Sequence, residues 1–231
     1  MPAASLALAL LLVAGGSAAG PALPTELPAV ARGRLQPIAE HADVTTQVEA
    51  EPFVARRDVF EYLLDHPEFA SHVARTLRLA RYKITRTSDG LYLDDGWGAT
   101  GSFWLVYAHD GTRVMRARGE YKKTLLPAIH GDAITVIAYE ASPAPDGRNL
   151  LRTTVTGFVK LDSRLLATVM KLVGSAAQNK ADLEARRLMK VFARASRAID
   201  TDPAGVVAQL RQRPDVPPRE LEEFSRLLGL R

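Results

Sequence analysis

Histidine, carboxylate and serine side chains are the groups through which this chain could bind a metal or catalyse a reaction. The five histidines lack metal-ligand spacing: His66 and His72 are six positions apart, and no HxxxH or HExxH motif occurs. The adjacent Asp94 and Asp95 could supply an acid and a base, but Gly96 follows them, which is typical of a solvated turn. No serine lies in a GxSxG motif. We therefore predict no metal site and no catalytic residue.

Cofactor and nucleic-acid signals are also missing from the sequence. There is neither a GxxxxGK[ST] motif nor a glycine-rich dinucleotide loop after a strand, so we predict no cofactor. The absence of cysteine excludes disulfides, thiolate zinc sites and iron–sulfur clusters. The 30 basic and 26 acidic residues give a net charge of only +4, which is too mild an excess to indicate a nucleic-acid partner.

Residues 1–19 have the layout of a secretory signal peptide. Leu6–Ala14 is an apolar run of nine residues, and Ser17 and Ala19 occupy the −3 and −1 positions of a cleavage site, although no basic residue precedes the run. An uncleaved anchor helix is the alternative, but a membrane span usually needs about 18 apolar residues. We expect an exported protein, periplasmic or extracellular, cleaved near Ala19. A proline-rich linker or wrapping arm is expected over residues 20–43.

The middle of the chain switches between strand and helix patterns. Thr45–Val54 predicts a strand, residues 55–64 have helical apolar spacing, and Pro67 suits the first turn of a second helix. After these helices, apolar and polar residues alternate, as is typical of strands. Asp89-Gly90 and Asp110-Gly111 are hairpin signals, and we expect a loop around Pro127, His130 and Gly131. We expect six or seven strands in an antiparallel meander, including Tyr82–Thr87, Leu91–Leu93, Gly101–Ala108, Thr112–Tyr121, Ala133–Tyr139 and Leu150–Leu161.

The Asp110-Gly111 hairpin sets a register for the strands on either side of it. With a two-residue turn, His109 pairs with Thr112, and alternation then gives one face of the hairpin that is free of charge. Small side chains on this face leave room in front of the sheet, unless a packed helix fills that room. The residues expected to point inward are Trp104, Val106, Met115, Ala117, Gly119 and Tyr121.

After Asp162 the apolar residues recur at helical spacing over about 35 residues. Asp162 or Ser163 is a suitable N-cap, and the apolar stripe continues to Ile199. One or two short helices are expected in the tail, residues 200–231, whose apolar side could dock onto a partner or back onto the domain. The first part of this apolar helical face consists of Leu165, Leu166, Val169, Met170 and Val173.

The order of one strand, two helices, a meander and a long helix resembles the START-like superfamily, also called SRPBCC or helix-grip. The stretches Gln47–Phe60, Tyr62–Phe69 and Gly157–Lys171 carry the resemblance, which covers about residues 44–199. It implies an α+β helix-grip fold in which a curved antiparallel sheet wraps the long C-terminal helix, with a cavity for lipids, sterols or other apolar molecules between them. By this resemblance, Val155, Leu166, Val169, Met170 and Val173 line the cavity together with the inward residues of the hairpin.

Three functions are compatible with these patterns. The favoured prediction is an exported protein that binds an apolar, lipid-like molecule in that cavity. A cavity-based enzyme, resembling cyclases or hydrolases of the same fold, is the alternative. It would need an inward polar group with a shifted pKa, such as Tyr107, Tyr121, Asp95 or His130; the register turns Tyr107 outward. The third is a structural or interaction protein whose core is filled and holds no ligand.

Basic residues gather in two places along the chain. Arg113, Arg116 and Arg118 lie on one strand, followed closely by Lys122 and Lys123. This basic strip could contact an anionic membrane surface, or it could be a solvated outer face that discourages edge-to-edge association. A second row marks the polar side of the long helix, at Arg186, Arg187, Lys190, Arg194 and Arg197. Trp97, between two glycines, could touch a membrane or close one end of the core.

Overall fold

A computed structural model describes residues 20–123, 126–163 and 174–230. Within these residues the chain forms six helices and one antiparallel sheet of eight strands, which is an α+β fold. The strands run as a meander from β3 to β8. Their bounds are β1 (Val44–Glu49), β2 (Phe53–Ala55), β3 (Lys83–Thr87), β4 (Gly90–Asp94), β5 (Ala99–His109), β6 (Thr112–Lys123), β7 (Leu126–Pro143) and β8 (Asn149–Leu161).

The sheet has the order β1-β8-β7-β6-β5-β4-β3, and the short β2 also pairs with β8, beyond the end of β1. The first predicted strand is therefore two strands with a break at Ala50–Pro52. The loop predicted around Pro127, His130 and Gly131 is wrong, because these residues belong to the long strand β7, in which His130 and Gly131 pair with β6. Proline is tolerated there because it stands near the start of its strand.

The helices are α1 (Ala29–Glu40), α2 (Arg57–Asp65), α3 (Pro67–Thr76), α5 (Gly174–Thr201), α6 (Pro203–Arg211) and α7 (Pro218–Leu227). Proline opens α3, α6 and α7, as the rigid ring favours a first helical turn. The carboxylate of Asp202 caps α6 by accepting from the backbone N–H of Gly205 at 2.9 Å. Helix α5 has 28 residues; the expected helix face over 165–173 lies outside the described residues.

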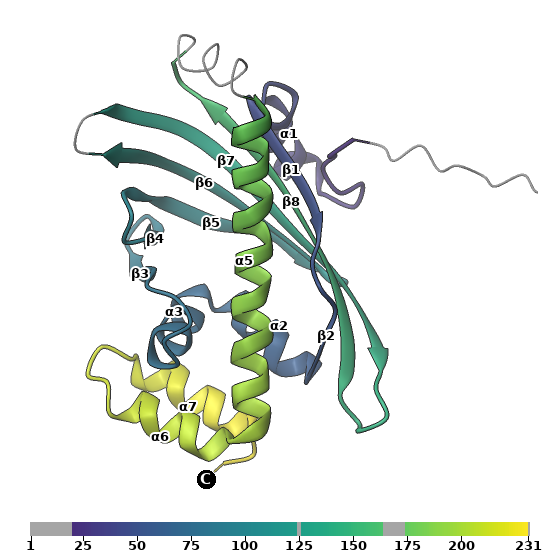
Figure 1. The fold of residues 1–231 in the computed structure, drawn as a ribbon, viewed down its shortest axis with the longest axis vertical. Coiled ribbons are helices and arrows are strands. Elements are labelled where there is room, and N and C mark those ends of the chain that lie inside the picture. The colour runs from purple at the N-terminus through teal and green to yellow at the C-terminus, as the bar shows by residue number, and fades with distance from the viewer. Residues whose placement is uncertain (1–19, 124–125, 164–173, 231) are drawn as a thin grey trace, which may run out of the picture.

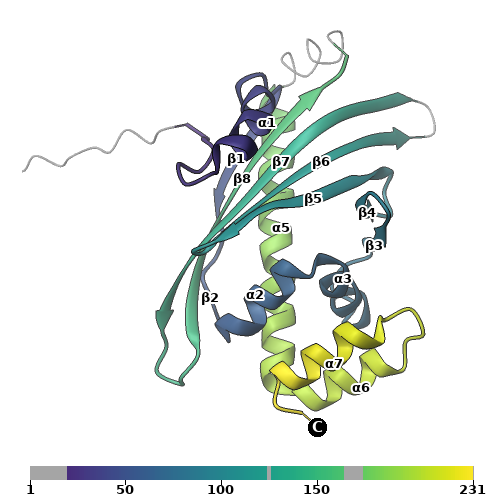
Figure 2. The ribbon, with the colours of Figure 1, turned by 180° about the vertical axis from the view of Figure 1, so that it is seen from behind.

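Helix α5 crosses one face of the twisted sheet, while α1 lies on the opposite face (Figures 1 and 2). We call the face toward α5 the inner face. In the sheet, α5 packs mainly against β1, β2 and β8, so it follows one edge of the sheet rather than its middle. The main core is formed where α2, α3, α5, α6 and α7 meet at the lower half of the inner face.

The C-terminal tail belongs to this main core. Leu210 on α6 and Phe224 on α7 are fully buried, and the Phe224 ring lies 5.0 Å from the ring of Phe69 on α3. Of the two roles considered for its apolar side, docking back onto the domain is the one the structure shows.

The proline-rich segment over residues 20–43 is a wrapping arm that contains a helix. Apolar side chains of α1, three residues apart, and others from the segment before α1 cover the outer face of the sheet. They pack against Val114, Ile134, Val136 and Phe158, and this outer core contains Leu23, Leu27, Leu35 and Ile38 of the arm.

A β-bulge at Val106 shifts the register of the β5–β6 hairpin. The predicted pairing holds from His109–Thr112 to Tyr107–Val114, but Leu105, not Val106, then pairs with Met115. From Leu105 back to the start of β5, every side chain therefore lies on the face opposite to the predicted one. The prediction that Trp104 and Val106 point inward is therefore wrong. Trp104 lies opposite Arg116 and is 37% exposed, and Val106 packs against the outer core.

Candidate ligand-binding site

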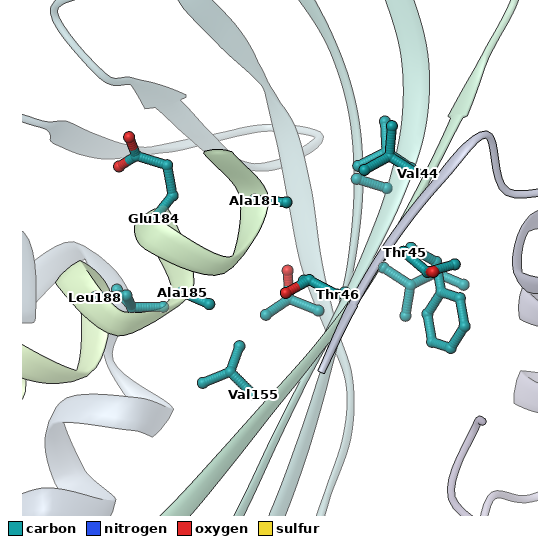
Figure 3. A pocket seen from close by; sticks show the side chains of 14 residues that line it. Val44, Thr45, Thr46, Val155, Ala181, Glu184, Ala185 and Leu188 are labelled. Atoms are coloured by element: carbon teal, nitrogen blue, oxygen red, sulfur yellow. The ribbon is translucent and has the colours of Figure 1, made fainter. Parts of the chain in front are cut away.

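A pocket of about 280 Å³ lies between α5 and the inner face of the sheet near the β1 edge (Figure 3). Small residues on both walls leave this space: Ala133 and Gly157 on the strands, and Ala181 and Ala185 on the helix. A larger side chain at any of these positions would fill it. On the inner face and on α5 the lining consists of Val44, Thr46, Ala133, Thr135, Val155, Gly157, Val159, Ala181, Glu184, Ala185 and Leu188. Thr45, Ile134 and Phe158 also border it, although their side chains belong to the outer face of the strands.

The described residues that line the pocket are mainly apolar. In Figure 3 the side chains of Thr46 and Val155 point toward α5, whereas the carboxylate of Glu184 is directed away from the strands. Glu184 is paired there with Lys180 at 3.4 Å and Arg187 at 2.8 Å. The buried hydroxyl of Thr46 donates to the carboxylate of Asp182, so its polar group is satisfied by the protein. Among the described residues that line the pocket, Glu184 is the charged one, and its charge is paired outside the pocket.

The predicted lining residues are distributed over four places, of which the outer face holds Trp104 and Val106. Val155 lines the pocket. Met115, Ala117 and Gly119 of β6 lie on the inner face, as predicted, but they do not line the pocket. Met115 and Ala117 pack instead against a small cluster of Ile84, Leu91 and Phe103. Tyr121 follows on the same face by alternation. Leu166, Val169, Met170 and Val173 lie outside the described residues.

Several pocket residues were not foreseen, above all Thr46 and Ala133 on the strands and Ala181 and Leu188 on the helix. Their positions depend on where α5 crosses the sheet, which no local pattern specifies. The one available signal was the recurrence of alanine at 181 and 185, four residues apart on the same helix side.

The polar residues considered for catalysis are not brought together. Asp95 accepts backbone N–H groups of Trp97 and Ala99 at 2.7 and 2.9 Å, so it forms the expected solvated turn with Asp94. His130 lies 3.8 Å from Glu120, and both side chains are exposed. Tyr107 packs with the outer core, as its predicted outward orientation requires. None of these groups lines the pocket.

Titratable groups with shifted pKa values instead tie α2 to the sheet. Arg113 of β6, which is 7% exposed, donates to both carboxylate oxygens of Asp65, at 2.5 and 2.9 Å. This hydrogen bonding raises the pKa of Arg113. Burial and the hydrogen bond that it donates to Glu61 raise the pKa of Tyr139 to about 12. Burial alone would raise the pKa of Glu61, but the bonds from Tyr139 and Arg57 outweigh it and hold the pKa below its usual range.

The three arginines of the basic strip on β6 are paired with carboxylates of the protein. Arg113 points inward to Asp65, Arg116 lies 3.2 Å from Asp132, and Arg118 pairs with Asp132 and Asp162. These three arginines therefore have carboxylate partners within the protein. Lys122, the next basic residue, is exposed. Contact of the strip with an anionic membrane surface stays a prediction.

The described residues contain neither a metal-binding cluster nor a membrane-spanning helix. Within them, no group of three or more histidine and carboxylate side chains is placed to hold a metal ion. No helix among them is long and apolar enough to cross a membrane. Trp97 is 69% exposed, with the guanidinium of Arg81 over its ring at 5.6 Å, so it does not close one end of the core.

The chain is similar to known proteins at the level of structure. No protein-family model matches the chain, and no curated protein matches it. Among solved structures, the chain is similar to the hypothetical protein jhp0584 from Helicobacter pylori, solved at 1.88 Å resolution. The two share 9% sequence identity with a TM-score of 0.39, over 67% of this chain and 89% of that one.

Proposed function

We propose that this chain is an exported binding protein that holds an apolar, lipid-like molecule between the sheet and α5. The observation that carries the proposal is the pocket itself: two walls of small and apolar side chains, with its one carboxylate directed away. Such a site binds by removing apolar ligand surface from water, which needs no charged partner.

The size of the pocket limits the ligand. A volume of about 280 Å³ lies at the lower end of the range for small-molecule sites, which is about 300–1,000 Å³. It suits a short apolar molecule or part of a longer one, such as a section of an acyl chain. The proposal therefore favours binding of one apolar group per protein over the uptake of a whole two-chain lipid.

The proposed fold family is the START-like, helix-grip superfamily. The element order supports it: a first strand, two short helices, an antiparallel meander and a long helix on the inner face. Export rests on the layout of residues 1–19, and it is tested separately by the N-terminal mass of the protein recovered from expressing cells. A mass that corresponds to a chain beginning near Gly20 would support cleavage of a signal peptide. A mass that includes residues 1–19 would support an uncleaved anchor helix.

The experiment that tests the function is native mass spectrometry of the protein purified from the cells that make it, followed by organic extraction. We expect an apolar molecule at one copy per protein, identified in the extract. A ligand-free mass that stays unchanged after incubation with mixed lipids would favour the interaction protein with a filled core. Chemical turnover of an added lipid would favour the enzyme.

A further inference from the structure

A second hollow lies where the first strand of the sheet is interrupted. The chain leaves the β1 strand at Ala50, passes Pro52 and returns to β8 as β2, and the break opens a cleft of about 720 Å³ against α5. None of its lining residues lines the apolar pocket. We call it the basic cleft, because its lining contains Arg148, Arg186, Lys190, Arg194 and Arg197, against the single carboxylate of Glu51.

The five cations of the basic cleft are not equally paired. Arg148 is neutralised by Asp146 at 2.5 Å and by Asp200 at 3.0 Å, and Arg186 donates to the backbone carbonyl of Glu49 at 3.1 Å. The other three, Lys190, Arg194 and Arg197, are exposed and have neither an ion pair nor a side-chain hydrogen bond within the described part of the chain. They therefore offer their full donor capacity to a ligand.

The spacing of these three residues brings their positive charges together, so they repel one another unless an anion lies between them. Positions 190, 194 and 197 follow the i, i+4, i+7 pattern of a single helix face, where like charges destabilise a helix. Elsewhere on α5 the same problem is solved internally, since Glu184 pairs with both Lys180 and Arg187. No carboxylate plays that role between Lys190 and Arg197, so an external anion would relieve the repulsion.

The floor of the basic cleft is apolar. Phe53, Val54 and Leu150 contribute from the strands, and Met189 and Ala193 contribute from α5. A fully hydrated inorganic ion would leave this floor unused, whereas an anion with a hydrocarbon part would cover it. Arginine and lysine are the residues that bind phosphate oxygens, with arginine able to donate two bonds at once.

We propose that the basic cleft binds a phosphate group attached to an apolar body, as in a phospholipid headgroup at a membrane surface or in a soluble alkyl phosphate. The phosphate lies against Lys190, Arg194 and Arg197, and the apolar body covers Phe53 and Leu150. This site is independent of the apolar pocket, and either can exist without the other.

The test compares two triple variants with matched loss of charge. The first is Lys190→Gln/Arg194→Gln/Arg197→Gln. The control is Arg34→Gln/Arg211→Gln/Arg219→Gln, whose three exposed side chains line neither hollow. All six side chains are exposed, so both variants should fold, and thermal unfolding checks that they do. The probes are octyl phosphate below its micelle concentration, inorganic phosphate, and vesicles of phosphatidylglycerol or of phosphatidylcholine.

We expect saturable binding of octyl phosphate or of phosphatidylglycerol vesicles, weakened about tenfold in the cleft variant by the loss of three partly exposed ion pairs. The control should stay within about twofold of the wild-type affinity, because distant charges are screened by salt. Binding of octyl phosphate identifies a soluble source, and binding of the vesicles alone identifies a headgroup held in a membrane. Equal weakening in both variants, or binding of neither probe, would overturn the proposal. An Ala181→Phe variant, filled in the apolar pocket, should bind these probes normally.

Discussion

Thr46 on β1 and Asp182 on α5 are joined by a hydrogen bond in which the buried threonine hydroxyl donates to the carboxylate. The same carboxylate oxygen accepts from the amide of Gln178 at 3.1 Å. Thr46 also lines the apolar pocket, so this bond fixes one wall of the pocket to the other. A charged acceptor makes it stronger than a neutral pair, and its partial burial protects it from water.

Replacing Thr46 by valine keeps the shape of the side chain and removes the donor. We expect the free energy of unfolding to fall by about 1–2 kcal/mol, because Asp182 retains only the bond from Gln178. Urea unfolding followed by circular dichroism measures the change. Thr45→Val is the control, since that side chain lies on the other side of β1 in Figure 3. Equal losses in the two variants would contradict a special role for the Thr46 hydroxyl.

The Asp65–Arg113 pair should be needed to keep α2 on the sheet. Asp65→Asn leaves a 7%-exposed guanidinium without its charge partner. We expect a loss of about 2 kcal/mol, less than for a fully buried pair because the Asp65 side chain is 36% exposed. The double variant Asp65→Leu/Arg113→Met should recover much of this loss, as a packed apolar pair leaves no charge uncompensated. Asp58→Asn, which breaks an exposed pair with Arg56, should cost less than about 0.5 kcal/mol.

His72 on α3 should make the stability depend on pH. Burial and the guanidinium of Arg75 lower the pKa of His72, while Asp215 opposes this shift. The unfolded chain therefore takes up a proton near pH 6.5, whereas the folded chain does so only at lower pH. The stabilising contribution is present above about pH 6.5 and is lost as the pH falls toward the folded-state pKa.

Denaturant unfolding at pH 7 and at pH 5 measures this dependence. We expect the difference between the two free energies of unfolding to shrink in a His72→Gln variant. His41→Gln, at an exposed position, should leave the difference unchanged. An unaltered pH dependence in the His72 variant would show that other groups cause it.

A row of three glycines marks the middle of the sheet, where Gly101, Gly119 and Gly131 face one another across β5, β6 and β7. A Cβ atom on Gly119 would lie 2.5 Å from the carbonyl oxygen of Thr100 and 3.3 Å from the Cα of Gly101. Because these atoms belong to the backbone, they cannot move aside cheaply.

We expect Gly119→Ala to lower the thermal midpoint, at a cost of about 1–3 kcal/mol, since two strands must separate to admit the methyl group. Gly33 in α1 is the control, because a Cβ there meets nothing within 4 Å. Gly33→Ala should be neutral or stabilising by up to about 1 kcal/mol, as alanine favours a helix interior. A Gly119→Ala protein as stable as wild type would contradict the close approach of β5 and β6.

The hairpins and the alternation of elements could be predicted from the sequence, because Asp110-Gly111 is a strong turn signal and both residues have positive φ in the structure. The bulge at Val106 could not, since Phe103, Trp104, Leu105 and Val106 are all apolar and give no period by which to choose a face. Helix α1 was not predicted, because the prolines in and around it are typical of a linker. Leu35 and Ile38 are nevertheless buried on one side of this helix.

The candidate site was predicted only in its general place. The hairpin register indicated the inner face, and the family resemblance named Val155, which lines the pocket. It could not show that α5 follows the β1 edge, and so it placed most of the expected site on β5 and β6. That crossing depends on long-range packing of α5 against β1, β2 and the other helices of the main core, which no local pattern specifies.

The central claim is that an apolar ligand occupies the space between α5 and the sheet. The most direct test is a fluorescence titration with the neutral apolar probe N-phenyl-1-naphthylamine, which has no charge to attract it to the basic cleft. Wild type is compared with Ala181→Phe, which fills the pocket, and with Ala176→Phe, an exposed position on the same helix. We predict saturable binding by wild type and Ala176→Phe, with an affinity reduced about tenfold or more in Ala181→Phe, as expected when a bulky group occupies an apolar site. Equal binding by all three proteins, or binding by none, would contradict the assignment.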